Sequence, residues 1–87
     1  MEEGNVRVPS GSIGWAVAAM RDGAKVRRRG WNGKGMHLFF VGSPELIRSG
    51  SHDDWQSFVA MRTSDGTNVP WLCSQTDLLM YDWELAA

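Results

Sequence analysis

The sequence predicts one α+β domain, in which an N-terminal helix packs on a small, mostly antiparallel β-sheet and a short second helix follows later. Three observations support this fold class. Apolar residues recur at helical spacing near the start, short strand-like runs separated by glycine-rich turns follow, and the chain has only 87 residues. A chain of this length has room for one core and none for separate binding and catalytic domains.

The first predicted element is a helix over residues 13–22. Ser12 is a good N-cap, and Gly23 is placed to end the helix in a left-handed conformation. The apolar residues at the i, i+3, i+4, i+7 spacing of one helix face are Ile13, Ala16, Val17 and Met20. Residues 1–11 are rich in glycine, proline and serine, so we expect a flexible leader before a single ligand-binding domain at 12–87.

Short strands are predicted after the helix. They cover residues 24–29, 36–41, 58–62, 69–72 and 81–85. The apolar run 38–41, bounded by Gly35 and Gly42, is typical of a central strand packed on both faces. The last strand is expected at an edge of the sheet, and residues 43–56 are interpreted as a variable loop.

The third and fourth strands are predicted to form a hairpin. Asp65-Gly66 has the turn chemistry that a hairpin needs, and Pro70 is tolerated in a return strand at a sheet edge. Thr76 can then cap a brief helix over residues 77–80.

The charge balance argues against a polymeric nucleic acid as partner. Nine Lys and Arg residues face ten Asp and Glu residues, so the net charge is −1 and the chain has no overall basic field. The basic residues are nevertheless uneven, with five of them between Lys25 and Lys34. A local anion site is therefore compatible with the composition.

The number of cysteines and the hydropathy of the chain indicate in which cellular compartment the protein is found. Cys73 is the only cysteine, which excludes an internal disulfide framework. The first residues lack the apolar segment of an export signal, and no run approaches the roughly 20 apolar residues of a membrane span. We therefore expect a cytoplasmic protein without membrane association.

Five tryptophans, at positions 15, 31, 55, 71 and 83, are many for so short a chain. Trp15 and Trp83 lie inside predicted elements and are assigned to core or subunit packing, whereas Trp55 stays undecided. Trp31 lies in the glycine-rich stretch 29–35, where backbone N–H groups can approach a phosphate. The same stretch also fits an ordinary hairpin turn, because Asn32-Gly33 is the preferred pair of a type I′ turn.

A second cluster, between Asp65 and Asp77, places amide, hydroxyl and carboxylate groups beside Trp71. Such a mixture suits recognition of a nucleobase and a ribose, since an indole can stack on the base. The alternative is structural, with a turn at Asp65 and a helix cap at Ser74 or Thr76.

Catalytic patterns are poorly supported. His37 and His52 have no second ligand at metal spacing, Cys73 has no evident base partner, and Asp53-Asp54 fits a solvated loop. We therefore predict a protein that is not an enzyme and needs no cofactor or metal.

Several blocks of the sequence resemble one family. They are Gly23-Ala24-Lys25-Val26, Arg29-Gly30-Trp31-Asn32-Gly33-Lys34-Gly35-Met36, Asp65-Gly66-Thr67, Val69-Pro70-Trp71-Leu72, Ser74-Gln75-Thr76-Asp77-Leu78-Leu79 and Asp82-Trp83-Glu84. In this order they resemble the phage Thoeris anti-defence proteins of the second type, over most of residues 12–85. The leader is longer and the loop at 43–56 shorter than is usual in that family.

The resemblance implies a function and partners. The chain would be a homo-oligomer, expected to be a tetramer, that binds glycocyclic ADP-ribose signals made by bacterial TIR-domain enzymes in the cytoplasm of the infected host. It would withhold these signals from the defence effector without cleaving them, as a sponge does. Some members also hold cyclic dinucleotides of the CBASS defence system in separate pockets.

Residue types and resemblance together suggest a ligand site. The candidate residues are Arg29, Trp31, Asn32, Lys34, Thr67, Trp71, Ser74, Gln75 and Asp77. The tryptophans would stack on adenine or wall the pocket, the cations would face the pyrophosphate, and the remaining polar groups would contact ribose or base. Two alternatives are a structural or protein-interaction domain of a phage and a hydrolase that destroys the signal, for which no activated water or base is evident.

Overall fold

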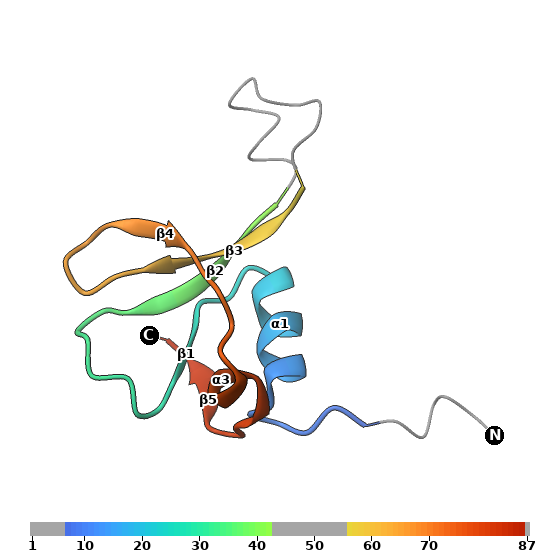
Figure 1. Cartoon of the computed structure of the whole chain (residues 1–87). Helices are drawn as coiled ribbons and strands as arrows, with labels where there is room; N and C mark the ends of the chain where they lie inside the picture. The colour runs from blue at the N-terminus through green and yellow to red at the C-terminus, as the bar shows by residue number, and fades with distance from the viewer. Residues whose placement is uncertain (1–6, 43–55, 87) are drawn as a thin grey trace.

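The α+β prediction is confirmed by the computed structural model, which describes residues 7–42 and 56–86 (Figure 1). The elements are α1 (Ile13–Arg21), β1 (Val26–Arg28), β2 (His37–Val41), β3 (Phe58–Arg62), β4 (Asn68–Pro70), α3 (Gln75–Leu79) and β5 (Trp83–Leu85). Apart from Gln56, the predicted variable loop lies outside the described residues. Neither described helix is long and apolar enough to cross a membrane.

The strands form one antiparallel sheet in the order β4-β3-β2-β1-β5. This order confirms that β2 is central and that β5 lies at an edge. The prediction that β2 packs on both faces is wrong for the single chain: Leu38 is fully buried against α1, but Phe39 and Val41 point to the other face and are only half-buried. The alternation of side chains along a strand explains the difference, because α1 covers one face (Figure 1).

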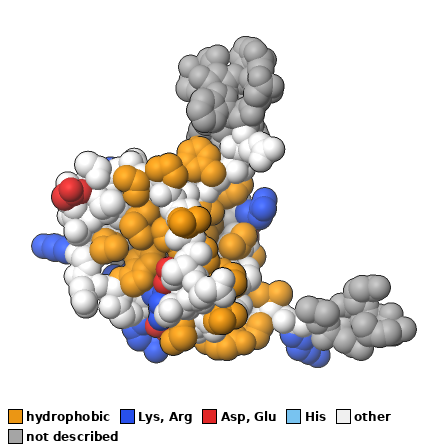
Figure 2. Space-filling model, viewed as in Figure 1, with side chains coloured by type: hydrophobic (Ala, Val, Ile, Leu, Met, Phe, Trp, Pro, Cys, Tyr) orange, Lys and Arg blue, Asp and Glu red, His pale blue; other side chains and the backbone are white. Residues whose placement is uncertain are grey.

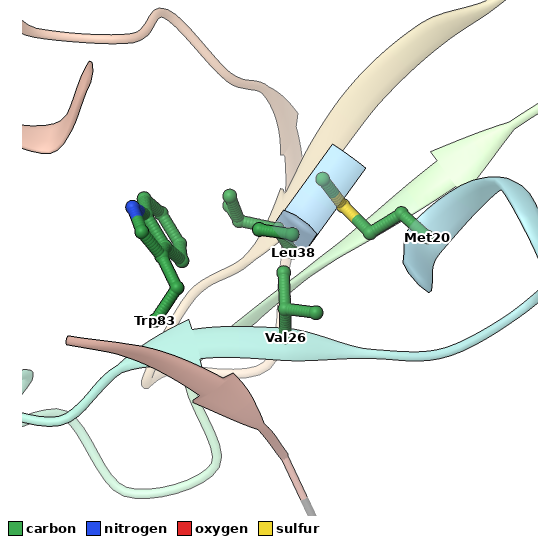
Figure 3. Close-up of a cluster of buried hydrophobic side chains, with 5 residues drawn as sticks. Met20, Val26, Leu38 and Trp83 are labelled. Carbon is green, nitrogen blue, oxygen red and sulfur yellow. The ribbon is translucent and has the colours of Figure 1, made fainter. Parts of the chain in front are cut away.

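The core lies between α1 and the sheet and consists of Ala16, Met20, Val26, Leu38 and Trp83. Figure 3 shows four of these side chains converging from the helix and three strands. Val26 and Leu38 are direct cross-strand partners, so both project toward the helix. Full burial of an aliphatic side chain of this size contributes about 1.5–3 kcal/mol, so this small cluster accounts for much of the domain's stability.

The ends of α1 are as predicted. The Ser12 side chain accepts a hydrogen bond from the Trp15 backbone N–H at 3.2 Å. Gly23 has φ +97° and donates its backbone N–H to the Met20 carbonyl at 2.9 Å, which closes the helix in a left-handed turn.

The turns both confirm and correct the sequence-based predictions. The hairpin between β3 and β4 turns at Gly66, with φ +89°, as expected. The prediction of a type I′ turn at Asn32-Gly33 is wrong, because neither residue has the positive φ that this turn requires. A Cβ at Gly33 would overlap the Met36 side chain and touch that of Ser64, so the glycine permits the loop to lie close against the hairpin turn.

The second helix begins earlier than predicted. Ser74, not Thr76, is the N-cap, and its side chain accepts a hydrogen bond from the Asp77 backbone N–H at 3.1 Å. Serine and threonine are both suited to capping, and here the earlier of the two residues is the cap.

Gly11 joins the segment before α1 to the last strand. It is buried, has φ +85°, and accepts the backbone N–H of Trp83 at 3.0 Å. A Cβ at this position would stand 2.5 Å from the Tyr81 carbonyl oxygen. Only glycine therefore allows this contact without movement of the backbone.

We predict that Gly11→Ala destabilises the fold more than Gly23→Ala does. Both positions have positive φ, which costs a non-glycine residue about 1–2 kcal/mol, but a Cβ at Gly23 meets nothing within 4 Å. The clash at Gly11 should add about 1–3 kcal/mol to the loss. Urea denaturation of the two variants measures the difference, and equal losses would contradict the close packing described here.

Candidate functional site

The two tryptophans predicted to contact a ligand both pack against Trp83. The rings of Trp31 and Trp83 are 5.5 Å apart at 75°, and those of Trp71 and Trp83 are 5.9 Å apart at 84°. Both are edge-to-face pairs, the arrangement that the charge distribution of aromatic rings favours. Trp83 is 3% exposed, whereas Trp31 and Trp71 are half-buried and keep part of each ring at the surface.

Backbone hydrogen bonds fix where these rings stand. Trp31 donates its backbone N–H to the Arg28 carbonyl at 3.1 Å, directly after β1. Trp71 donates its own to the Val59 carbonyl at 2.9 Å, which extends the pairing of β4 with β3. The two loops are 40 residues apart in sequence and meet because β1 and β3 flank the same central strand.

The helix α3 is attached to this cluster by the indole of Trp83. Its Nε1–H donates to the Asp77 carbonyl at 3.0 Å. Three predicted ligand residues therefore lie on or beside α3, next to the tryptophans: Ser74 as the N-cap, exposed Gln75 as the first residue and Asp77 in the first turn.

A three-residue ionic cluster holds α3 and β5 against β1. The Arg28 guanidinium donates to Asp77 Oδ1 at 2.9 Å and to the two carboxylate oxygens of Asp82 at 2.8 and 3.3 Å. The side chains are mostly buried, with 15% exposure for Arg28 and 16% for Asp77. Hydrogen bonding to Asp82 and then Asp77 raises the pKa of Arg28, and the bond from Arg28 lowers the pKa of Asp82.

Sequence reasoning missed this cluster. Arg28 belongs to the basic stretch, but its partners lie 49 and 54 residues further along the chain, and no local spacing connects them. Asp77, predicted as a ligand residue, has one carboxylate oxygen bonded to Arg28. Its contact with a ligand stays a prediction.

The other predicted site residues divide into two groups. Arg29, Asn32 and Lys34 are exposed on or beside the glycine-rich loop, and Arg29 Nε is 3.6 Å from Glu84 Oε1. Thr67 lies in the hairpin turn, where its hydroxyl donates to Asp65 Oδ1 at 3.0 Å. The structure therefore leaves the first three side chains accessible and uses the hydroxyl of Thr67 within its own turn.

Cys73 lies beside α3 and is half-buried. Burial, with a smaller effect of the nearby Asp77 carboxylate, raises its pKa. At neutral pH the side chain is a thiol and a weak nucleophile. Among the described residues, no group of three or more His, Cys, Asp or Glu side chains is arranged to hold a metal ion.

Comparison with known proteins identifies the family. Residues 11–86 match the family model described as the Thoeris anti-defense 2-like domain. The chain belongs to this family. It is 33% identical over 84 residues to Thoeris anti-defense 2 of Bacillus phage SP01, a match that covers 87% of this chain and 94% of the phage protein. The resemblance seen in the sequence blocks is thereby confirmed, and the blocks around Trp31 and Trp71 are the ones that meet at Trp83.

We predict that Asp82→Asn lowers the free energy of unfolding by about 1.5–3 kcal/mol at neutral pH, because Arg28 loses a charged hydrogen-bond acceptor. The pKa of Asp82 lies below its ordinary value of 3.8 in the folded state, so the pair stabilises the fold above that pH. This contribution to stability is lost as the pH falls below the ordinary pKa of an aspartate and then through the lower pKa that Asp82 has in the folded state. The difference between wild type and variant should therefore narrow under acid conditions.

Urea denaturation across this pH range measures the effect, with Glu84→Gln as the control. Glu84 pairs with Arg27, but the side chains are 30% and 45% exposed, so its loss should cost only about 0–1 kcal/mol. A difference between wild type and Asp82→Asn that stays constant down to the lowest pH would contradict the ionic cluster.

Proposed function

We propose that this chain is a phage anti-defence sponge, which binds glycocyclic ADP-ribose signals of TIR-domain enzymes in the infected host's cytoplasm and withholds them uncleaved. Its family membership supports the anti-defence role. One observation supports the binding role most directly: Trp31 and Trp71, both half-buried, are held edge-on to the same buried indole of Trp83.

The ring geometry suits an adenine base. Stacking of a base on an aromatic side chain contributes about 1–3 kcal/mol. Because Trp83 restrains both partner rings, little conformational entropy would be lost when a base packs against them. The exposed cations Arg29 and Lys34, on either side of Trp31 in the chain, would face the pyrophosphate.

The remaining polar residues of the predicted site differ in how well they are suited to bind ribose or base. Asn32 and Gln75 are exposed and offer both donors and acceptors to ribose or base. Ser74 accepts the helix-capping bond, but its hydroxyl can still donate. Thr67 is the least suited, because its hydroxyl already donates to Asp65.

Two alternatives compete with sequestration. A hydrolase would need an activated nucleophile, and the raised pKa of Cys73 makes this thiol unsuited to that role. A phage structural or interaction domain would use the tryptophans only for packing, which fits Trp83 better than the half-buried Trp31 and Trp71. Cyclic dinucleotides of the CBASS system enter the proposal as a second ligand class through the family resemblance alone.

A second copy of this chain is proposed to cover the surface beside the site. The segment from Leu72 to Tyr81 exposes large apolar side chains: Leu72 is 90% exposed, and Leu79 and Tyr81 are each 67% exposed. The helix α3 has no buried residue at all. Hydrophobic side chains cover much of the face seen in Figure 2. Association of copies would bury this surface and enclose a ligand between them. That the assembly is a tetramer is what the family resemblance implies.

We predict more than one subunit per particle by multi-angle light scattering, and dissociation on Leu72→Glu. A carboxylate at this 90% exposed position costs nothing in an isolated subunit but is unfavourable in an apolar interface. Gln56→Glu is the control, because it adds the same charge at an exposed position outside the Leu72–Tyr81 segment. A monomeric wild type at micromolar concentration would remove the basis for a shared pocket.

We predict that wild type binds glycocyclic ADP-ribose in isothermal titration and releases it intact when the complex is heated. Chromatography of the released material distinguishes the three hypotheses. Release of intact ligand supports sequestration, and release of linear ADP-ribose would show that the protein is a hydrolase. If no ligand binds, the hypothesis of a structural or interaction domain is the one that remains.

We predict that Trp31→Ala weakens this binding by about 1–3 kcal/mol, the contribution of one stacked base. The loss of its edge-to-face pair with Trp83 should cost about 0.5–1.5 kcal/mol of stability, in addition to the loss of the ring's partial burial. Trp15→Ala is the packing control, since Trp15 packs against the core outside the three-ring cluster and its loss should lower stability without weakening binding. An intact Trp31→Ala fold with unchanged affinity would exclude Trp31 from the site.

A further inference from the structure

The loop between β1 and β2 contains an asparagine-glycine pair that the fold leaves accessible. Asn32 is exposed and is followed directly by Gly33. Among the described residues, neither the side-chain amide of Asn32 nor the backbone N–H of Gly33 has a hydrogen-bond partner. These are the two groups that react when an asparagine deamidates, because the backbone nitrogen of the next residue attacks the side-chain amide carbon.

The glycine of this pair is required by packing. A Cβ at Gly33 would overlap the Met36 side chain and stand 3.0 Å from the Ser64 Cβ. The absence of a side chain at this position also leaves the backbone nitrogen unshielded from the neighbouring amide carbon. The contact that brings the loop against the hairpin turn therefore places the least hindered residue type directly after Asn32.

The charges along the loop favour the same reaction. Lys34 follows the pair directly and is exposed, as is Arg29 before it. Negative charge develops first on the Gly33 nitrogen and then on an oxyanion at the Asn32 side chain, and nearby cations stabilise such charge. Among the described residues, Lys34 has no acidic partner that would offset this effect.

The structure describes one further asparagine, Asn68, which differs in each of these respects except exposure. It lies in β4, and its Oδ1 accepts a hydrogen bond from Arg62 Nη1 at 3.1 Å. The residue after it is the β-branched Val69, which pairs with Met61 across the sheet. A branched side chain in a paired strand shields the backbone nitrogen and restricts its movement. The fold therefore restrains Asn68 and leaves Asn32 free to react.

We propose that Asn32 is a site of spontaneous deamidation, which converts it to aspartate or isoaspartate and thereby weakens ligand binding at this loop. The Gly33 backbone nitrogen loses its proton to hydroxide and forms a bond with Asn32 Cγ. The Cγ–Nδ2 bond breaks, the leaving nitrogen takes up a proton from water, and ammonia departs from a five-membered succinimide. Water then opens the ring at either carbonyl. The net change is hydrolysis of an amide to a carboxylate, without oxidation or reduction.

The product changes the charge of the candidate ligand site. The new carboxylate lies between Arg29 and Lys34 in the chain, the two cations expected to face the pyrophosphate, and it repels that group. Isoaspartate also lengthens the backbone by one carbon atom where Gly33 is closely packed. The effect on binding rests on the proposed function, whereas the modification itself does not. The protein therefore loses affinity for its ligand as it ages.

Peptide mass spectrometry of the aged full chain tests the modification. Trypsin releases residues 30–34, in which Asn32 carries the only side-chain amide. In mildly alkaline buffer this peptide should gain the mass of one deamidation long before Asn68 does, and Asn32→Gln should stay unmodified because its ring closure is slower. The rate at Asn32 should be similar in the folded chain and in urea. Equal rates at Asn32 and Asn68, or strong protection of Asn32 by folding, would overturn the proposal.

Isothermal titration with glycocyclic ADP-ribose tests the effect on binding. Asn32→Asp should bind about tenfold more weakly than fresh wild type. The difference should shrink at high salt, because it arises from charge repulsion. Asn68→Asp is the control, since it makes the same charge change in the hairpin, and it should bind as wild type does. Equal affinity of Asn32→Asp and wild type would overturn the effect on binding. Fresh wild type that does not bind would contradict the proposed function, and with it this effect, but not the modification.

Discussion

The buried Trp83 contacts more separate segments of this small domain than its place on a short strand suggests. This residue lies on an edge strand, yet it is 3% exposed because the start of the domain, the two candidate ligand loops and α3 all contact it. Its backbone N–H donates to the Gly11 carbonyl, and its indole N–H donates to the Asp77 carbonyl in α3. Trp31 and Trp71 both pack edge-to-face against its ring. Through its backbone and its indole, this one residue therefore joins the start of the domain, both candidate ligand loops and the second helix.

Electrostatics reinforces the same arrangement and connects it to function. Arg28 joins α3 to β5 through two carboxylates, so the polar groups of α3 are held beside the tryptophans before any ligand arrives. A protein that only sequesters its ligand gains most from such a rigid site, since its affinity is not diminished by ordering of side chains. The proposed function needs no reactive group, and the protonated thiol of Cys73 agrees with that.

Local structure could be predicted from the sequence, whereas long-range pairing could not. Ser12, Gly23 and Gly66 act where their chemistry indicated, because caps and turns depend on neighbouring residues. The predicted turn at Asn32-Gly33 is not formed: neither residue has positive φ, and the loop lies close to Met36 and to the distant Ser64 at Gly33, which the local pair of residues does not reveal. The partners of Arg28 lie on α3 and beside β5, which no spacing within the chain reveals.

In the proposed function, Trp83 holds Trp31 and Trp71 in place to contact a ligand. The most direct measurement is the ¹H–¹⁵N spectrum of the indole groups, recorded while glycocyclic ADP-ribose is added. Trp15, on α1, is the internal reference, because it packs against the core outside this trio of rings. We expect the indole signals of Trp31 and Trp71 to shift together while the signal of Trp15 stays in place. If saturating ligand leaves the Trp31 and Trp71 signals unmoved, these two rings do not contact the ligand.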